Sequence, residues 1–395
     1  MLLWKIGTGF AVGAALILGA SPALAAGGWT IVSIPPTGQN ANLQGVSATS
    51  DTGAWAVGNS NGAKNTGLGS RALIDHWNGT AWSQATAPAI TGSVNLQAVS
   101  SSGAGDAWAV GYQRPQRYTF VPLALQWNGT AWATSASAST ALPGDTYLVG
   151  VADISPADAY AIGDNTPLAS GELAHWNGTN WTQVSYPLPT NTGFPNTLNA
   201  ISADGPNDVW ITGSYMIQVS QTALRYETFS LHWNGSTWSV VQMPKVTGSD
   251  NLLAYEFSSI DALSPTNVWA VGGSGDNVIG IGGSPSNTLI EHWNGTAWSI
   301  VPSPSPGTNA ALTGVTSSSA SNIWAVGYHT PAGATQPQTL TLNWNGTAWT
   351  TVASPNQGSP SVLTSVSTTP GAAIVWSVGY SGTTGSFSPL ALENG

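Results

Sequence analysis

The sequence predicts an all-β chain folded as a seven-bladed β-propeller of four-stranded antiparallel blades. Two repeated motifs support this prediction. A W-A-V-G strand, or a close variant, occurs seven times, starting at Trp55, Trp108, Tyr160, Trp210, Trp269, Trp324 and Trp376. A W-N-G-[ST]-x-W motif occurs six times, starting at Trp77, Trp127, Trp176, Trp233, Trp293 and Trp344. The resulting period of about 50–60 residues fits one propeller blade.

The two ends of the chain together complete one repeat. The seventh W-N-G motif is cut short at Glu393-Asn394-Gly395, whereas Trp29–Val32 matches Trp298–Val301, the strand that follows a W-N-G motif. A linear solenoid needs capping repeats and has no reason to split one. We therefore expect the N-terminal strand to close the ring, with blade 7 divided between 29–35 and 361–395.

Each repeat is expected to contain four strands. In blade 1 these are Leu43–Ser50, Gly53–Asn59, Arg71–Trp77 and Thr80–Ala87. They are short stretches rich in Val, Ile and Trp, separated by Gly, Pro, Ser and Asn. The Asn-Gly pair predicts a two-residue type I′ hairpin between the third and fourth strands. That hairpin makes Trp77 and Trp82 diagonal neighbours on one sheet face, where their indoles can fill the wedge between blades.

Residues 1–26 have the pattern of a secretory signal peptide. Lys5 carries the only positive charge, an apolar run extends from Phe10 to Ala20, and Ala23-Leu24-Ala25 is a small-x-small cleavage pattern. The run is shorter than the about 20 apolar residues of a membrane span, and Gly interrupts it. We therefore expect a secreted protein, cleaved near Ala25, without membrane insertion. Residues 27–395 are expected to form a single propeller domain.

The composition excludes several classes of function. Charged residues make up only 6% of the chain, and 7 Lys+Arg against 17 Asp+Glu give a net charge of −10, which opposes nucleic-acid binding. The absence of Cys excludes disulfides, thiolate metal sites and a Cys nucleophile. With 42% hydrophobic residues the chain can bury a core, so disorder is not expected.

These repeats resemble those of kelch-type and galactose-oxidase-type propellers. Val271-Gly272-Gly273 keeps the Gly pair that ends the second kelch strand, whereas the other six repeats have one Gly. The N-G-[ST]-x-W hairpin is also similar to the Asp-box turn of sialidase-type repeats, with Asn in place of Asp. The resemblance covers nearly all of the predicted mature chain. It implies a fold rather than a reaction, because function depends on a particular site.

The polar residues that recur in every repeat are expected to be structural. Four histidines precede W-N-G motifs, namely His76, His175, His232 and His292. Equivalent strands diverge around a ring, so these side chains cannot share a metal and are expected to form hydrogen bonds between blades. Asp106, Asp158, Asp208, Asn267 and Asn322 precede the W-A-V-G aromatic by two residues and are expected in Asx-turns. We therefore predict no metal site and no cofactor.

Candidate ligand-binding residues come from the places where the repeats differ. Loops between the second and third strands of each blade share one face with the loops that join blades, and binding residues concentrate on such loops. Aromatic residues with a few hydrogen-bonding charges are typical of sugar and peptide recognition. The predicted site residues are Arg114, Arg117, Tyr118, Tyr215, Arg225, Tyr226 and Tyr255.

The leading functional hypothesis is a secreted, non-catalytic binding propeller. Its partner would be a glycan, as in a lectin, or an extracellular protein for which the propeller is a scaffold. The alternative is an extracellular carbohydrate-active enzyme, either a glycoside hydrolase or a lyase. No G-x-S-x-G or H-E-x-x-H motif occurs, and no catalytic residue is predicted. Two loop carboxyls at glycosidase spacing would favour the alternative. The oligomeric state stays open.

Overall fold

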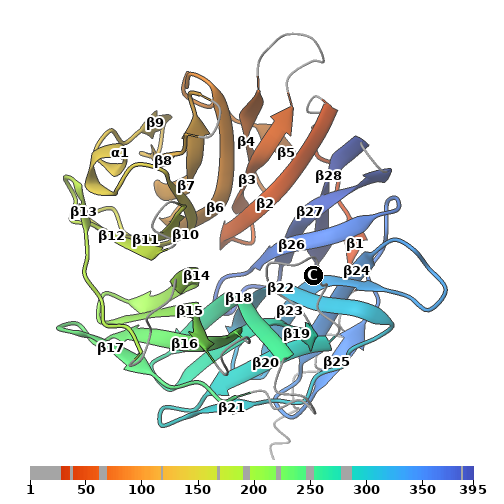
Figure 1. Cartoon of the computed structure of the whole chain (residues 1–395). Helices are drawn as coiled ribbons and strands as arrows, with labels where there is room; N and C mark the ends of the chain where they lie inside the picture. The colour runs from red at the N-terminus through yellow and green to blue at the C-terminus, as the bar shows by residue number, and fades with distance from the viewer. Residues whose placement is uncertain are drawn as a thin grey trace, which may run out of the picture.

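The computed structural model describes residues 28–35, 39–61, 69–116, 119–166, 170–189, 196–218, 224–245, 253–276, 287–383 and 386–395. In these ranges the strands form seven four-stranded antiparallel sheets, arranged as blades around a central axis (Figure 1). The predicted seven-bladed all-β propeller is therefore confirmed. The predicted signal peptide lies outside the described residues.

In each blade the innermost strand comes first and the outermost strand last; in blade 7 the outermost strand is supplied by the N-terminus. Blade 1 consists of β2 (Gln39–Ser50), β3 (Gly53–Asn61), β4 (Ser70–Trp77) and β5 (Trp82–Gln84). Blade 2 consists of β6 (Ser93–Gly103), β7 (Asp106–Arg114), β8 (Val121–Trp127) and β9 (Trp132–Thr134). Blade 3 consists of β10 (Thr146–Ser155), β11 (Asp158–Asn165), β12 (Ser170–Trp176) and β13 (Trp181–Gln183). Blade 4 consists of β14 (Asn196–Gly205), β15 (Asp208–Gln218), β16 (Leu224–Trp233) and β17 (Trp238–Val241). Blade 5 consists of β18 (Leu253–Ser264), β19 (Asn267–Asp276), β20 (Asn287–Trp293) and β21 (Trp298–Ile300). Blade 6 consists of β22 (Thr308–Ser319), β23 (Asn322–Thr330), β24 (Gln338–Trp344) and β25 (Trp349–Val352). Blade 7 consists of β26 (Ser361–Ser367), β27 (Val375–Thr383), β28 (Ser386–Asn394) and β1 (Thr30–Ile31). A short helix, α1 (Ala138–Ala141), lies between blades 2 and 3.

The N-terminal strand completes blade 7, as predicted. Strand β1 pairs with β28, with Thr30 opposite Glu393 and Ile31 opposite Leu392. The indole of Trp29 is buried and meets Trp324 of blade 6 edge to face, with ring centres 5.2 Å apart. The two chain ends therefore lie in one sheet, and Trp29 has the role of the tryptophan that closes each of the other hairpins.

The hydrophobic core lies between neighbouring blades and is built from repeated groups of indoles. At the junction of blades 7 and 1, Trp376 is fully buried between Trp77 and Trp82, with ring centres 4.7 and 5.0 Å away. The same insertion recurs around the ring, for Trp55, Trp108, Trp210 and Trp269 against the hairpin of the following blade. The abundance of Trp in this chain is thus mainly a packing requirement.

The hairpins between third and fourth strands differ from the predicted type I′ turn. Trp77 pairs directly with Trp82, so the loop has four residues and the two indoles are opposite rather than diagonal neighbours. Asn78 has no positive φ, whereas Gly79 has φ +90°. The Asn78 Oδ1 instead accepts hydrogen bonds from the backbone N–H of Thr80 and Ala81, each at 3.0 Å. The Asn side chain closes the loop as an Asx-turn, which a two-residue loop could not accommodate.

Three of the four histidines, His175, His232 and His292, form hydrogen bonds within their own blades, not between blades as predicted. His175 Nε2 lies 2.8 Å from Asp158 Oδ1, and His232 Nε2 lies 2.7 Å from Asp208 Oδ1. His232 also stacks on Trp210, with ring centres 4.1 Å apart. The acid two residues before the W-A-V-G aromatic therefore orients the imidazole, because its strand is the direct neighbour of the histidine's strand.

Hydroxyl side chains join neighbouring inner strands around the central channel. Ser47 Oγ accepts a hydrogen bond from the backbone N–H of Ser101, and Ser100 Oγ accepts one from Asp153. Equivalent bonds run to Ser202, Thr316 and Ser367 from Ala262, Thr368 and Ala48. These bonds satisfy backbone donors where the inner strands have no partner strand.

Candidate functional site

Seven residue pairs surround the channel on the loop face, the face that carries the loops between second and third strands and those between blades. Each pair joins an inner-strand residue to the second-strand residue that directly follows the Gly of the W-A-V-G motif. We name these fourteen residues the mouth ring. From blade 1 to blade 7 the pairs are Asn42–Asn59, Asn95–Tyr112, Tyr147–Asp164, Thr197–Ser214, Glu256–Gly273, Ala311–Tyr328 and Val362–Tyr380.

Two backbone features, repeated in every blade, position the mouth ring. The Gly before each second-strand member lies against the inner strand, and a Cβ atom on Gly111 would be 2.0 Å from the carbonyl oxygen of Asn95. Just beyond this contact the inner strand has a β-bulge, which in blade 2 follows Leu96. The extra residue, Gln97, lines the channel. Close approach and bulge together bring side chains of all seven blades to one opening.

The channel contains two cavities along its length. The cavity nearer the mouth ring has a volume of ≈ 170 Å³ and is lined by the bulge residues of all seven blades, among them Gln44, Asn199 and Thr313. The cavity farther from the mouth ring has a volume of ≈ 230 Å³ and is lined by Ser, Val and Ile side chains together with Asp153 and Asp261. Burial and repulsion from Asp106 raise the pKa of Asp153 to about 8, and burial raises the pKa of Asp261 to about 6.

An aromatic platform, made of Tyr112, Phe120 and Tyr147, lies where blades 2 and 3 meet the mouth. The ring centre of Phe120 is 5.1 Å from that of Tyr112 and 5.7 Å from that of Tyr147. The guanidinium carbon of Arg114 lies 5.0 Å from the centre of the Phe120 ring, which is a cation–π contact. All three rings are partly exposed. Such rings bind amphipathic ligands, because an apolar face stands beside a hydroxyl group.

Two carboxyl groups, Asp164 and Glu256, lie beside the aromatic platform. Asp164 Oδ1 accepts a hydrogen bond from the backbone N–H of Leu198 at 3.3 Å, and the Tyr147 hydroxyl bonds the same carboxyl group. Asn199 Nδ2 donates to Glu256 Oε1 at 3.3 Å. These contacts connect blades 3, 4 and 5 at the channel mouth.

The protonation of these carboxyls is set mainly by burial. Burial raises the pKa of Asp164 to about 7; the hydrogen bonds from Leu198 and Tyr147 oppose this rise, and repulsion from Glu256 adds to it. Burial also raises the pKa of Glu256. Burial and the nearby Asp164 raise the pKa of Tyr147 to about 12, so this hydroxyl stays protonated. A carboxyl that keeps its proton near neutral pH, beside a second carboxyl, is suited to acid–base chemistry.

Blades 6 and 7 present a second aromatic group to the mouth. Tyr380 meets Phe387 edge to face, with ring centres 5.1 Å apart. Burial and the proximity of Tyr380 raise the pKa of Tyr328. The inner-strand partners of these two tyrosines, Ala311 and Val362, carry no polar group. The mouth ring is therefore aromatic on two sides and acidic at blades 3 and 5.

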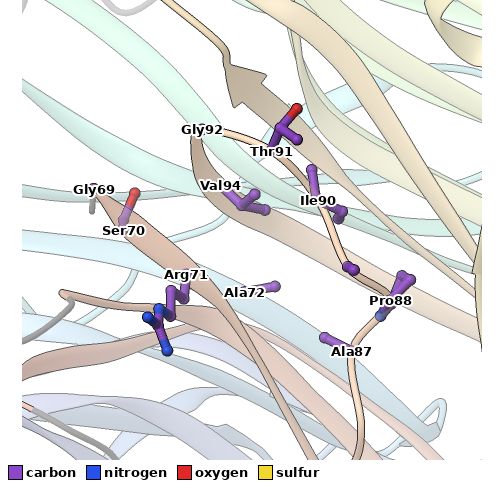
Figure 2. A pocket seen from close by; sticks show the side chains of 11 residues that line it. Gly69, Ser70, Arg71, Ala72, Ala87, Pro88, Ile90, Thr91, Gly92 and Val94 are labelled. Atoms are coloured by element: carbon purple, nitrogen blue, oxygen red, sulfur yellow. The ribbon is translucent and has the colours of Figure 1, made fainter. Parts of the chain in front are cut away.

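A groove of ≈ 520 Å³ lies away from the channel, between the start of β4 and the segment that joins blades 1 and 2. Figure 2 shows Ala72, Ile90 and Val94 inside it, with the Arg71 guanidinium pointing away from Ile90. Its lining includes no carboxyl, imidazole or tyrosine. The groove offers an apolar surface but no acid–base group, so the mouth ring is the better candidate for chemistry.

The seven predicted site residues are not all described. Arg114 lies beside the aromatic platform, as stated above, whereas Arg117 and Tyr118 lie outside the described residues. Tyr215 is buried, and its hydroxyl donates to Glu227 Oε2 at 2.9 Å. Lys245 Nζ donates to the other oxygen of this carboxyl, also at 2.9 Å. These bonds attach the end of β15 to β16 and to the next interblade segment.

The other predicted residues are placed by their backbones alone. Arg225 and Tyr226 lie near the start of β16, opposite Ile217 and Met216, and Tyr255 lies near the start of β18, opposite Ser274. Their side chains are outside the described ones. A ligand-binding role for the seven residues stays a prediction.

Sequence reasoning missed the acids and most of the aromatic residues of the mouth ring. Asp164, Tyr112, Tyr328 and Tyr380 each follow the Gly of a W-A-V-G motif directly. That position varies in chemistry from repeat to repeat although its neighbours barely change. This contrast is the sequence signal that could have located them.

In the described part of the chain, no group of three or more His, Cys, Asp or Glu residues is arranged to hold a metal ion. No helix in the same residues is long and apolar enough to cross a membrane.

No family model and no curated protein matches the chain. Among solved structures, YCF48 from Cyanidioschyzon merolae superposes with a TM-score of 0.54 and 15% identity, covering 93% of this chain and 98% of its own. A PL25 ulvan lyase, solved bound to -[GlcA(1-4)Rha3S]-, has a TM-score of 0.55 and 10% identity, covering 93% of both chains. The polysaccharide lyase Uly1 has a TM-score of 0.55 and 10% identity, covering 92% of this chain and 90% of its own.

At these identities the likenesses establish the shared propeller fold. The neighbours of this propeller include polysaccharide lyases. The resemblance to kelch-type and galactose-oxidase-type propellers stays a prediction.

Proposed function

We propose that this chain is an extracellular carbohydrate-active enzyme that hydrolyses glycosidic bonds of a neutral polysaccharide at the mouth ring. The observation that carries the proposal is the pair of carboxyls, Asp164 and Glu256, beside an aromatic platform at the opening of the channel. The extracellular location rests on the signal-peptide pattern of residues 1–26.

Binding is assigned to the platform and to neighbouring amides. The faces of Tyr112, Phe120 and Tyr147 would stack on the apolar faces of sugar rings. The Asn59 and Asn95 amides, which are hydrogen-bonded to each other across blades 1 and 2, would exchange hydrogen bonds with sugar hydroxyls. The second aromatic group, at Tyr328 and Tyr380, would support a chain that extends across the mouth.

The proposed reaction requires one carboxyl to be protonated and the other ionised. Asp164, whose pKa is raised to about 7, would donate its proton to the glycosidic oxygen as that C–O bond breaks. Ionised Glu256 would take a proton from the water whose oxygen bonds to the anomeric carbon. The products are two shorter sugars, and the proton taken up by Glu256 returns to Asp164 through solvent. Asn199 would orient Glu256 through its hydrogen bond.

Charge favours hydrolysis of a neutral chain over cleavage of an acidic one. The ligand in the ulvan lyase structure contains glucuronate and a sulfated rhamnose. The mouth ring itself contains no Lys or Arg, Arg114 is the cation placed against the platform, and the whole chain carries 7 Lys+Arg against 17 Asp+Glu. A polyanion would therefore approach an acidic opening, which like-charge repulsion opposes. The two lyases support the proposal only as examples of carbohydrate chemistry on this fold.

The proposal is tested by the release of reducing ends from β-glucan, xylan, arabinan and galactan. We expect release from at least one of them, with a rate that falls as pH rises through about 7, because Asp164 then loses its proton. The rate should also fall as pH drops through the pKa of Glu256, which burial raises above its ordinary value. Asp164→Asn and Glu256→Gln should each lower kcat by about 10²- to 10⁴-fold. Asp51→Asn, an exposed acid of the turn between β2 and β3, is the matched control.

Other results would overturn the hydrolase. Absorbance at 235 nm from ulvan, without reducing-end release from neutral chains, would assign a lyase instead. Binding of an oligosaccharide without cleavage at any pH would assign a non-catalytic glycan-binding propeller. This second candidate is favoured by the aromatic platform itself, which needs no acid to bind a sugar. A folded protein that neither binds nor cleaves any glycan would exclude both functions.

A further inference from the structure

Two carboxyl side chains occupy positions that are apolar in the other five blades. Asp75 in β4 and Glu291 in β20 lie two residues before the first Trp of their W-N-G motifs. The equivalent residues, by strand register, are Leu125, Ala174, Leu231, Leu342 and Leu392. All seven positions have an exposed fraction of 2% or less, and that of Asp75 and Glu291 is 0%. The acids therefore stand in places built for aliphatic side chains.

Asp75 faces the junction of blades 1 and 7. Its neighbours on the same face of β4, Leu73 and Trp77, pack with Trp376 and Val378 of blade 7. Neither carboxyl oxygen of Asp75 has a hydrogen-bond partner. Burial raises the pKa of this group to about 7.

Few other titratable groups belong to the elements around Asp75. They are Arg71 and His76 on β4 itself, Tyr380 on β27 and Glu393 on β28. Arg71 is exposed, and His76 lies on the opposite face of β4, where it stacks on Trp55. Among the described residues on these elements, no cation offsets the burial of Asp75.

Glu291 has the same setting at the junction of blades 4 and 5. Leu289 and Trp293, which share its strand face, pack with Trp210 of blade 4. Both of its carboxyl oxygens lack a hydrogen-bond partner, and burial raises its pKa to about 8.

The described titratable side chains on the strands packed against Glu291 include no Lys or Arg, and Lys245, in the segment after β17 that contributes Met243 to this junction, is bonded to Glu227. On the strands of blade 4 they are Asp204, Asp208, Tyr215, Glu227 and His232, and on β20 itself His292. His232 and Asp208 are bonded to each other, and His292 is bonded to Asn267. An unpaired carboxylate in an apolar junction is strongly unfavourable, whereas the neutral acid is tolerated.

We propose that these two junctions are proton-dependent clamps: they hold blades 7 and 1, and blades 4 and 5, together while Asp75 and Glu291 are protonated, and they loosen when these carboxyls ionise. The propeller is accordingly built for acidic surroundings. The low content of charged residues, 6%, agrees with this, because stability then depends little on surface ion pairs that acid would break.

The direction of the effect follows from proton binding. Both carboxyls have a higher pKa in the folded chain than their ordinary values of 3.8 and 4.5. At pH values between the ordinary pKa and the raised pKa of each carboxyl, the folded chain binds more protons than the unfolded chain. The free energy of unfolding therefore falls as pH rises. The stabilising contribution is complete below about pH 4 and is lost as pH passes through about 7 for Asp75 and about 8 for Glu291.

The test is denaturant-induced unfolding of the full chain across this pH range. The unfolding equilibrium constant of the natural protein should rise between about pH 4 and pH 8 by on the order of a thousandfold for each carboxyl. The double variant Asp75→Leu/Glu291→Leu, which introduces the residue found at this position in four of the other five blades, should lose the share of the slope that comes from these two carboxyls. The slope that remains comes from other carboxyls whose pKa is raised by burial, among them Asp153, Asp164 and Asp261.

Controls make the result unambiguous. Asp51→Asn removes an exposed carboxyl but keeps the Oδ1 atom that accepts hydrogen bonds from Ala373 and Ile374 of blade 7, so it controls for the loss of a surface acid. The single variants Asp75→Asn and Glu291→Gln keep the shape of each side chain and should each remove their own share of the slope. A natural protein that is as stable at pH 8 as at pH 4 would overturn the proposal without any variant. So would a folded double variant with an unchanged slope.

Discussion

The two faces of the propeller use the same seven repeats in opposite ways. On the face formed by the W-N-G hairpins, six loops repeat one contact, from the Asn Oδ1 to the N–H two residues later, at 3.0 Å in all six. In the mouth ring on the loop face, equivalent second-strand positions carry Asn, Tyr, Asp, Ser and Gly. One face is uniform and the other is varied, although the same seven blades form both.

This difference separates scaffold from function. A hairpin that must return the chain over four residues, and place two indoles at a blade junction, tolerates few sequences. A mouth position is held by the backbone of its own strand and by the Gly beside it, so its side chain is free to vary. Uniform positions should therefore determine stability, and varied positions should determine binding and reactivity.

The largest expected effect is at blade 7, the one blade whose hairpin is replaced by two separate chain ends. Deleting Trp29–Pro35 removes β1 and the indole that packs on Trp324. We expect a loss of at least about 3–5 kcal/mol in the free energy of unfolding, the cost of truncating one buried Trp. Denaturant unfolding followed by Trp fluorescence measures it. An unchanged unfolding midpoint would mean that the ring closes without the N-terminal strand.

Much of the fold was predictable because the repeats report it many times. Seven copies of W-A-V-G and six of W-N-G determine the number of blades, and the match of Trp29–Val32 to Trp298–Val301 predicts the closure. The predicted hairpin type is wrong because the loop contains two residues more than the Asn-Gly pair. The Asn78 side chain instead closes a loop of four residues.

The candidate site was less accessible to sequence reasoning. The predicted ligand-binding residues were placed on long loops that contain Arg and Tyr. The acids of the mouth ring, by contrast, lie within strands. Asp164 and Glu256 come from blades 3 and 5, and Asn199 of blade 4 connects to Glu256. These three residues come close together because of the curvature of the ring and the bulge in each inner strand. The sequence of a single repeat does not reveal this proximity.

An intermediate effect is expected from Gly79→Ala on the hairpin face. Gly79 has φ +90°, and an added Cβ would lie 3.1 Å from the Cβ of Thr52. We expect a loss of about 1–2 kcal/mol, because an L-residue is strained in this conformation. Gly105→Ala is the matched control, since nothing lies within 4 Å of its added Cβ. Equal melting temperatures for the two variants would contradict the view that the hairpin glycines are structural.

The smallest effect on stability is expected from Tyr112→Ala in the mouth ring. Tyr112 is partly exposed and contacts Phe120 and Tyr147 by ring edges alone, so its removal should cost about 1 kcal/mol. Tyr160→Ala, at a W-A-V-G position with 5% of the residue exposed, should cost about 3–5 kcal/mol. Affinity for a bound oligosaccharide should change in the reverse order, with roughly a tenfold loss for Tyr112→Ala, about 1.4 kcal/mol, and none for Tyr160→Ala at a temperature where both are folded. Calorimetric titration beside denaturant unfolding measures both quantities. If Tyr112→Ala were as destabilising as Tyr160→Ala and left affinity unchanged, the mouth ring would be scaffold like the hairpins, and the division between the two faces would fail.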